Sequence, residues 1–143
     1  MRYWDPSALV PLIVSQPDSH LVREWLAEDD QIVTWVWTGT EIVSAIERLT
    51  REGKISRQQR RAALEEFGDL SNQWDEVTDA VAVRARALGV LARHPVRAAD
   101  AGQLAAAMLI QEQLTFPLSF MCLDRRLALA AEREGLRIPT EID

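Results

Sequence analysis

The sequence has few of the residues that form covalent cross-links or bind soft metals. Cys122 is the only cysteine among 143 residues, so the chain cannot form an internal disulfide bond. The only two histidines, His20 and His94, lie far apart in the sequence, and a zinc site made of cysteine and histidine is therefore poorly supported. The longest apolar run, residues 104–110, is too short to cross a bilayer. These absences argue against a disulfide-linked scaffold, a Cys/His zinc protein and a membrane-spanning protein.

The N-terminal residues lack a basic region followed by a long apolar stretch, so we expect no signal peptide, no membrane partner and a cytoplasmic location. The formal net charge of -6 argues against a uniformly basic nucleic-acid binder. It is compatible with an enzyme that acts on nucleic acid, because bound cations can balance some of the acids. With 48% hydrophobic residues, the chain has enough apolar surface for a single domain over residues 1–143.

Segments typical of short strands alternate with amphipathic helical patterns along the chain. We expect strands at residues 2–4, 31–37, 74–77, 119–123 and 136–139. We expect helices at residues 7–14, 19–28, 38–52, 56–73, 79–92, 97–113 and 125–134. This alternation predicts an α/β fold with a mostly parallel sheet of four or five short strands.

Four acidic residues occupy positions where such a fold gathers its binding sites. Asp5 directly follows the first expected strand, and Asp124 directly follows residues 120–123. Glu41 lies in the first turn of the helix after the second strand, and Asp100 lies early in its own helix. Sites in parallel sheets lie beyond the carboxyl ends of the strands, so we expect these carboxylates to project into one pocket.

Four carboxylates in one pocket repel one another, and that repulsion must be offset. A helix N-terminus stabilises a nearby carboxylate by only about 0.3–1 kcal/mol, which is too little to hold four of them together. A divalent cation would supply the remaining compensation. Mg²⁺ or Mn²⁺ suits a site made only of oxygen ligands.

Helix capping is the simpler explanation for each acid taken singly. Asp5, followed by Pro6, is a good N-cap, and Asp124 can cap the helix that comes after it. Residues 38–41 fit a capping box, and Asp100 fits an ordinary first-turn acid. Capping leaves unexplained why these acids start from apolar, core-like segments.

Each of the four acids stands in a short, recognisable segment. These segments are Asp5-Pro6-Ser7-Ala8-Leu9, Thr40-Glu41, Arg97-Ala98-Ala99-Asp100-Ala101-Gly102-Gln103-Leu104-Ala105-Ala106-Ala107 and Cys122-Leu123-Asp124-Arg125-Arg126-Leu127. In order, spacing and total length they resemble the four acidic motifs of PIN-domain ribonucleases, and most closely those of the VapC toxins of type II toxin–antitoxin systems. The resemblance implies a three-layer α/β/α PIN-like fold with a mostly parallel central sheet.

The resemblance also implies a metal-dependent endoribonuclease whose products carry a 5′-phosphate and a 3′-hydroxyl. Asp5, Glu41 and Asp100 would coordinate Mg²⁺ or Mn²⁺, directly or through water, and Asp124 would complete the site or hold a second ion. Ser7 would hydrogen-bond to Asp5 or to a metal-bound water. One or two divalent ions can activate the attacking water, neutralise the phosphate and stabilise the leaving oxygen.

Three positions depart from the family's pattern. Gln103 stands where many relatives have histidine, and Cys122 stands where serine or threonine is frequent. Pro6 intervenes between the first acid and Ser7. Because all four acids remain, these departures concern metal geometry and substrate handling more than activity itself.

An acidic chain needs local positive charge to bind RNA. Arg97, Arg125 and Arg126 lie beside the proposed acids, so they are the candidate contacts to RNA phosphates. A second basic cluster, residues 57–61, is better interpreted as a solvated helix face.

The resemblance implies protein partners besides the RNA substrate. VapC-like toxins form homodimers and are inhibited by a cognate antitoxin, with which they form larger hetero-oligomers. An apolar groove around Leu9, Leu12, Trp25 and Trp37 would suit an antitoxin helix. The same four residues are equally compatible with an ordinary core.

Two other functions remain open at the level of sequence. The chain is also compatible with a catalytically inactive PIN-like scaffold that binds RNA or protein, although retention of all four acids argues against it. An Asp-based phosphate-transfer domain would use Asp5 as nucleophile and a lysine late in the chain. Lys54 is the only lysine, which counts against that alternative.

Overall fold

The computed structural model describes residues 1–139. The strands are β1 (Arg2–Trp4), β2 (Ile32–Trp35), β3 (Asp75–Val77) and β4 (Phe120–Met121). The helices are α1 (Pro6–Ile13), α2 (Ser19–Glu28), α3 (Thr38–Arg51), α4 (Arg57–Ser71), α5 (Ala80–Arg93), α6 (Ala98–Gln111) and α7 (Arg125–Arg133). The predicted alternation of strands and helices is confirmed.

The four strands form one sheet in the order β3-β2-β1-β4, and every neighbouring pair is parallel. The predicted strand at 136–139 is wrong. Within the described residues, Arg137 alone pairs with the sheet, through an isolated bridge to Ser119. Pro139 has no N–H to donate, so the ladder does not continue along this segment.

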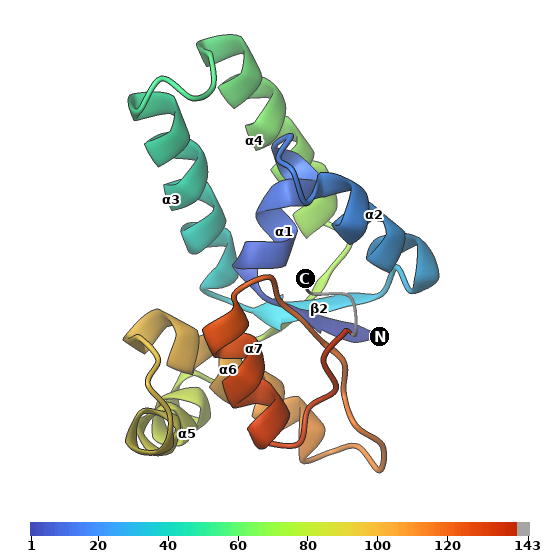
Figure 1. Cartoon of the computed structure of the whole chain (residues 1–143), viewed down its shortest axis with the longest axis vertical. Helices are drawn as coiled ribbons and strands as arrows, with labels where there is room; N and C mark the ends of the chain where they lie inside the picture. The colour runs from blue at the N-terminus through green and yellow to red at the C-terminus, as the bar shows by residue number, and fades with distance from the viewer. Residues whose placement is uncertain (140–143) are drawn as a thin grey trace.

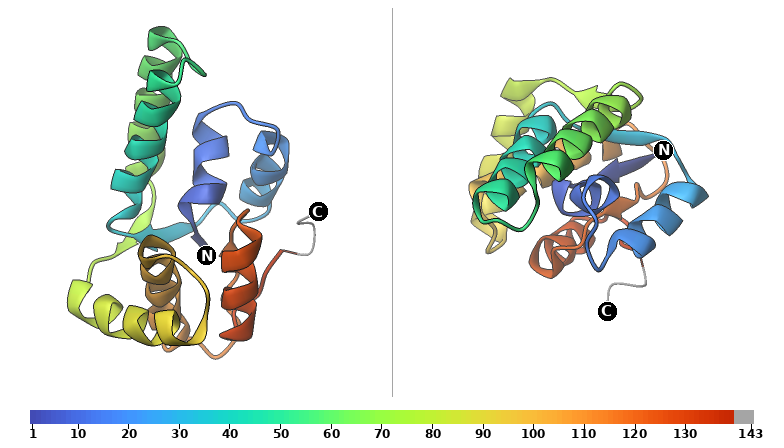
Figure 2. Two further views of the ribbon diagram at one scale, coloured as in Figure 1. Left: turned by 60° about the vertical axis from the view of Figure 1, so that its left-hand side comes forward. Right: turned by 90° about the horizontal axis from the view of Figure 1, so that it is seen from above.

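Side chains alternate between the two faces of the sheet, and each face is covered by helices. Tyr3, Val33 and Phe120 pack in a core with α5, α6 and α7. Trp4 and Met121 pack in a second core with α1, α2, α3 and α4. Figure 1 and Figure 2 show the two helix groups on opposite sides of the sheet. The predicted three-layer α/β/α architecture is therefore confirmed.

Helices α3 and α4 form a hairpin that extends away from the sheet, as the upper part of Figure 1 shows. Gly53 turns the chain at its tip with a φ of 72°, a left-handed conformation that glycine adopts without a Cβ clash. Arg60 of α4 forms an ion pair with Glu47 of α3. The hairpin stands above the edge of the sheet at which the carboxyl ends of the strands lie.

None of the helices within residues 1–139 has both the length and the apolar character needed to cross a membrane.

Candidate functional site

The carboxyl ends of the four parallel strands lie at one edge of the sheet, and the predicted acids lie at that edge. Asp5 follows β1 directly, and Asp124 begins α7 three residues after β4. Glu41 and Asp100 lie in the first turns of α3 and α6. An open cleft of about 810 Å³ is lined by Glu41, Asp100 and Asp124, together with four arginines. The structure therefore brings together acids that are far apart in the sequence.

Asp5 is the most deeply buried of these acids, with 4% of its surface exposed. It caps α1 as predicted, because its Oδ2 accepts a hydrogen bond from the backbone N–H of Ser7 at 3.0 Å. Burial raises the pKa of Asp5 to about 7; the charges of Glu41 and Asp100 add to this effect, while hydrogen bonding from Ser7 opposes it. The ionised form of Asp5 is thus poorly stabilised by the protein.

Ser7 ties the start of α1 to the segment that follows β4. Its backbone N–H binds Asp5, and its hydroxyl oxygen accepts a hydrogen bond from the Leu123 N–H at 3.0 Å. The same hydroxyl lies 3.6 Å from the Cys122 sulfur. Ser7 therefore holds the first and last acidic motifs together. Burial raises the pKa of the Cys122 thiol, so this cysteine stays protonated and is unsuited to act as a nucleophile.

Glu41 is held by Gln103 instead of by a capping box. The predicted capping box at residues 38–41 is wrong: the N-cap is Trp37, and no side chain caps this helix. The Thr38 hydroxyl turns inward and interacts with the Thr34 hydroxyl at 2.7 Å. Because Thr38 is already used in the core, Glu41 accepts its hydrogen bond from Gln103 Nε2 of α6.

Gln103 is almost completely buried, with 1% of its surface exposed. Its side chain forms hydrogen bonds with Glu41 and with two buried residues, Tyr3 and Thr38. Its Oε1 accepts from the Tyr3 hydroxyl at 2.7 Å, and its Nε2 donates to the Thr38 hydroxyl at 3.0 Å as well as to Glu41. Burial and the nearby charge of Asp100 raise the pKa of Glu41, while the bond from Gln103 opposes that rise. The sequence indicated that Gln103 departs from the family's pattern, but it did not predict the contact of Gln103 with Glu41.

Asp100, in the first turn of α6, and Asp124, the N-cap of α7, line the same cleft. Asp124 caps α7, because its Oδ1 accepts from the backbone N–H groups of Arg126 and Leu127 at 3.0 and 3.2 Å. Burial raises the pKa of Asp100, and the carboxylate of Asp124 adds to the rise. Arg97 and Arg126 act in the opposite direction. The predicted capping role of Asp124 is confirmed.

The acids interact through their charges without forming a ready-made chelate. Across residues 1–139, no three acidic, histidine or cysteine side chains are grouped closely enough to hold a metal ion together. The charges of Asp5, Glu41 and Asp100 nevertheless influence one another's pKa. Magnesium usually keeps several waters and uses only one or two carboxylates, so an all-oxygen donor set of this kind suits a hydrated divalent cation. Such a cation would also relieve the repulsion that raises these pKa values.

The cleft has a basic rim. The candidate phosphate contacts Arg97, Arg125 and Arg126 all line it. Arg48 of α3 lines it as well, although sequence analysis did not select it. The available signal was its spacing, because it stands seven residues, or about two helical turns, after Glu41. The cluster at residues 57–61 lines a separate hollow on the α3–α4 hairpin.

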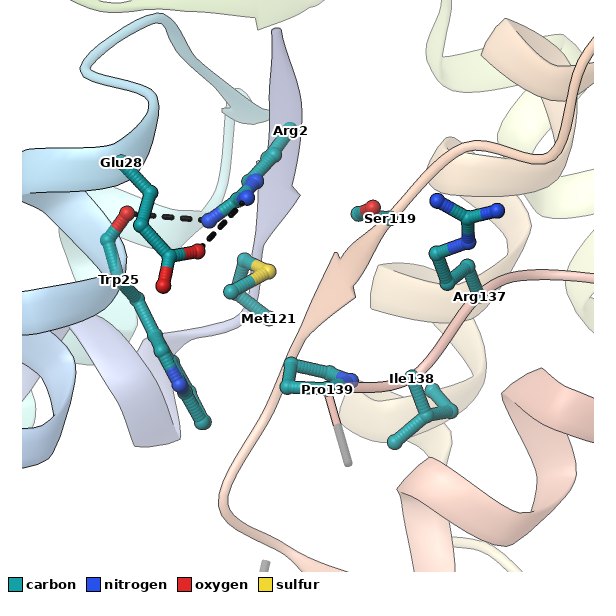
Figure 3. Close-up of a pocket in the computed structure, with 8 residues that line it drawn as sticks. All are labelled: Arg2, Trp25, Glu28, Ser119, Met121, Arg137, Ile138 and Pro139. Carbon is teal, nitrogen blue, oxygen red and sulfur yellow. Dashed lines mark hydrogen bonds and ion pairs between the residues drawn. The ribbon is translucent and has the colours of Figure 1, made fainter. Parts of the chain in front are cut away.

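Other residues considered from the sequence lie elsewhere. Leu9 and Trp25, expected in either a groove or a core, belong to the core. Trp37 is 58% exposed. A smaller hollow of about 220 Å³ lies at the opposite end of β1 and β4, and its walls include Trp25, Arg2 and Arg137. In Figure 3, Arg2 is engaged there with Glu28 and with the carbonyl of Trp25. None of the four acids lines this hollow.

Solved structures with a similar fold are known, but they share little sequence identity with this chain. No protein-family model matches the chain, and a search of curated proteins finds no match either. The crystal structure of FitAcB from Neisseria gonorrhoeae is similar, with a TM-score of 0.69 and 15% identity over 96% of both chains. That of PAE2754 from Pyrobaculum aerophilum has a TM-score of 0.64 and 18% identity, over 96% of this chain and 89% of the other. At these identities the likeness concerns the fold alone: the chain has a PIN-like three-layer α/β/α fold.

Proposed function

We propose that this protein is an endoribonuclease that depends on Mg²⁺ or Mn²⁺. One observation carries the proposal: Asp5, Glu41 and Asp100 have raised pKa values and lie with Asp124 at the open edge of the sheet. Keeping poorly compensated carboxylates together is costly for a stable fold, and a divalent cation removes that cost. Perturbed acids grouped in a cleft are typical of catalytic sites.

In this proposal, Asp5, Glu41, Asp100 and Asp124 hold the cation, directly or through water. When bound, the cation supplies neutralisation of the scissile phosphate and activation of the attacking water. Gln103 keeps the Glu41 carboxylate turned toward the site through its buried hydrogen bonds. Ser7 fixes the position of Asp5 relative to the segment that carries Asp124.

Arg97, Arg125 and Arg126 bind the phosphates of the RNA strand in this proposal. Their place on the rim of an open cleft of about 810 Å³ supports it, because a polynucleotide needs an accessible groove with local positive charge. Because the net charge of the chain is -6, a local concentration of arginines points more strongly to a site that binds anions. The resemblance to VapC toxins favours RNA over DNA as the substrate.

The test is cleavage of RNA in the presence of Mg²⁺ or Mn²⁺. We expect Asp5→Asn and Asp100→Asn each to lower the cleavage rate by at least about 100-fold, as for other groups that support charge in a transition state. Calorimetric titration with Mn²⁺ should show weaker binding in the same variants. Asparagine is as good an N-cap as aspartate, so Asp5→Asn keeps the start of α1.

Asp79→Asn is the matched control. Asp79 also follows a strand and caps a helix, since its Oδ1 accepts from the Ala82 N–H at 3.0 Å, but it does not line the cleft. This variant should cut RNA and bind Mn²⁺ like the wild type. Equal cleavage by all the variants would refute the assignment of the acids. RNA binding without cleavage would favour the catalytically inactive scaffold.

The structure gives no support to the phosphate-transfer alternative. Lys54, the only lysine, lies near the tip of the α3–α4 hairpin and pairs with Glu52.

We further propose that the chain acts as the toxin of a toxin–antitoxin pair, forms a homodimer and is inhibited by a cognate antitoxin. The PIN-like fold and the motif resemblance support this proposal. Light scattering of the purified chain tests the homodimer: a mass twice that of the 16.1 kDa chain is expected, and a monomer at high concentration would contradict it.

A further inference from the structure

We propose that Arg48 binds a phosphate of the RNA strand outside the scissile position and thereby sets the direction in which the strand leaves the acids, along α3. This inference rests on the proposed nuclease function and extends it to the path of the substrate. It concerns a residue that no motif contains.

Arg48 and Glu41 line the same cleft and belong to the same helix, seven residues apart. Seven residues are about two turns, so the two side chains lie on one face of α3 with their Cα atoms about 10 Å apart along the helix axis. A strand bound at the acids and running along α3 therefore meets Arg48 beyond its scissile phosphate.

The four arginines that line the cleft differ in their distance from the acids along the chain. Arg97 lies three residues before Asp100, and Arg125 and Arg126 directly follow Asp124, so these three charges stand beside the acids. Arg48 instead stands about two helical turns from Glu41, the acid on its own helix. The charge of Arg48 is thus set apart from the acids.

Across residues 1–139, no acidic side chain forms an ion pair with Arg48, and its side chain is exposed. Arg51, which is closer to the C-terminus of α3, already compensates the helix dipole at that end. An exposed arginine in a cleft, with its five donors unengaged, is well suited to phosphate.

The test measures binding of fluorescently labelled single-stranded RNA in EDTA, where no divalent cation supports cleavage. The RNAs are about 4 and about 12 nucleotides long, the range of site sizes found for single strands. Arg48→Gln should lower affinity for the longer RNA and reduce the slope of log K against log salt by about 0.7, the value expected for one phosphate contact. Arg48→Lys should restore most of that slope. The shorter RNA should show a much smaller difference.

Arg57→Gln is the matched control. Arg57 belongs to the same hairpin and loses the same charge, but it lines the separate hollow on α4. It should leave the salt slope unchanged. Equal slopes for wild type and Arg48→Gln, or equal losses for Arg48→Gln and Arg57→Gln, would overturn the inference.

A cleavage assay with Mg²⁺ separates this inference from the proposed function. Arg48→Gln should raise KM for the longer RNA and leave kcat within about threefold, because it removes binding made equally in ground and transition states. If Arg48 contributes to RNA binding but the wild type cuts no RNA, the inference stands and the nuclease function fails. If the wild type cuts RNA without any contribution from Arg48, only the inference fails.

Discussion

At the scale of single residues, Gln103 links the core of the protein to the candidate site. Burial raises the pKa of Tyr3, so the Tyr3 hydroxyl keeps the proton that it donates to Gln103 Oε1. This fixes the amide with Nε2 toward Glu41, since the reverse orientation would place an oxygen against the carboxylate. The orientation of Glu41 is therefore determined from inside the core.

Replacing Gln103 should reveal this link as a loss of stability. Gln103→Leu leaves the buried Tyr3 hydroxyl without its partner, and we expect the free energy of unfolding to fall by about 1–3 kcal/mol in urea titrations. Adding Tyr3→Phe to this variant should cost less than the two single changes together, because the two residues share one hydrogen bond. Gln113→Leu, at an exposed position of the turn after α6, should change stability by less than about 0.5 kcal/mol. Additive losses for the double variant would contradict the link.

The acids of the site were predictable from the sequence, and their supporting contacts were not. Asp5 directly follows β1 and Asp124 lies three residues after β4, so the expected strand ends alone indicated their positions. The roles of Gln103 and Arg48 depend on how the starts of α6 and α3, which cover opposite faces of the sheet, come together at its edge. That packing is a tertiary property, which the spacing of residues along one helix does not encode.

At the scale of elements, prediction succeeded where the local signals were strong. Residues 19–28 have an amphipathic pattern, and α2 covers those residues. Prediction failed at the start of α3, where the Thr38 hydroxyl is engaged by Thr34 and by Gln103 of α6 and does not form the capping box. It also extended β4 too far, because the apolar residues that follow Met121 pack in the core without pairing in the sheet.

The two aspartate caps explain why the site lies at helix starts. Asp5 uses Oδ2 to bind the Ser7 N–H, and Asp124 uses Oδ1 to bind two N–H groups of α7. Each helix start therefore fixes its carboxylate in one orientation at the sheet edge. A cap and a metal ligand are compatible roles, because the cap uses one carboxylate oxygen and leaves the other available.

At the scale of the whole molecule, the buried acids make stability depend on pH. The pKa of Asp5 is about 7 in the folded protein and 3.8 for the ordinary side chain. Because the folded state binds this proton more tightly, the stability that Asp5 contributes is fully present below about pH 4 and is lost as the pH rises to about 7. Burial of Glu41 and Asp100 acts in the same direction.

Asp5→Asn should remove much of this pH dependence, since asparagine does not titrate. In EDTA, the free energy of unfolding of the wild type relative to Asp5→Asn should fall by on the order of a few kcal/mol between about pH 4 and about pH 8. Adding Mg²⁺ at about pH 8 should raise the Tm of the wild type more than that of the variant, because the cation binds the ionised acids. A difference between the two proteins that does not change with pH would contradict the raised pKa.

The use of aspartate as the cap at two of these helix starts has an evolutionary consequence. An aspartate codon becomes an asparagine codon through one base change, and asparagine preserves the cap. Under the proposed nuclease function, a lineage carrying this fold is therefore a single mutation away from a protein that folds and no longer cuts RNA. Natural homologues with asparagine at position 5 or 124 would be expected to survive as intact, inactive proteins, and a toxic activity would offer selection a direct route to them.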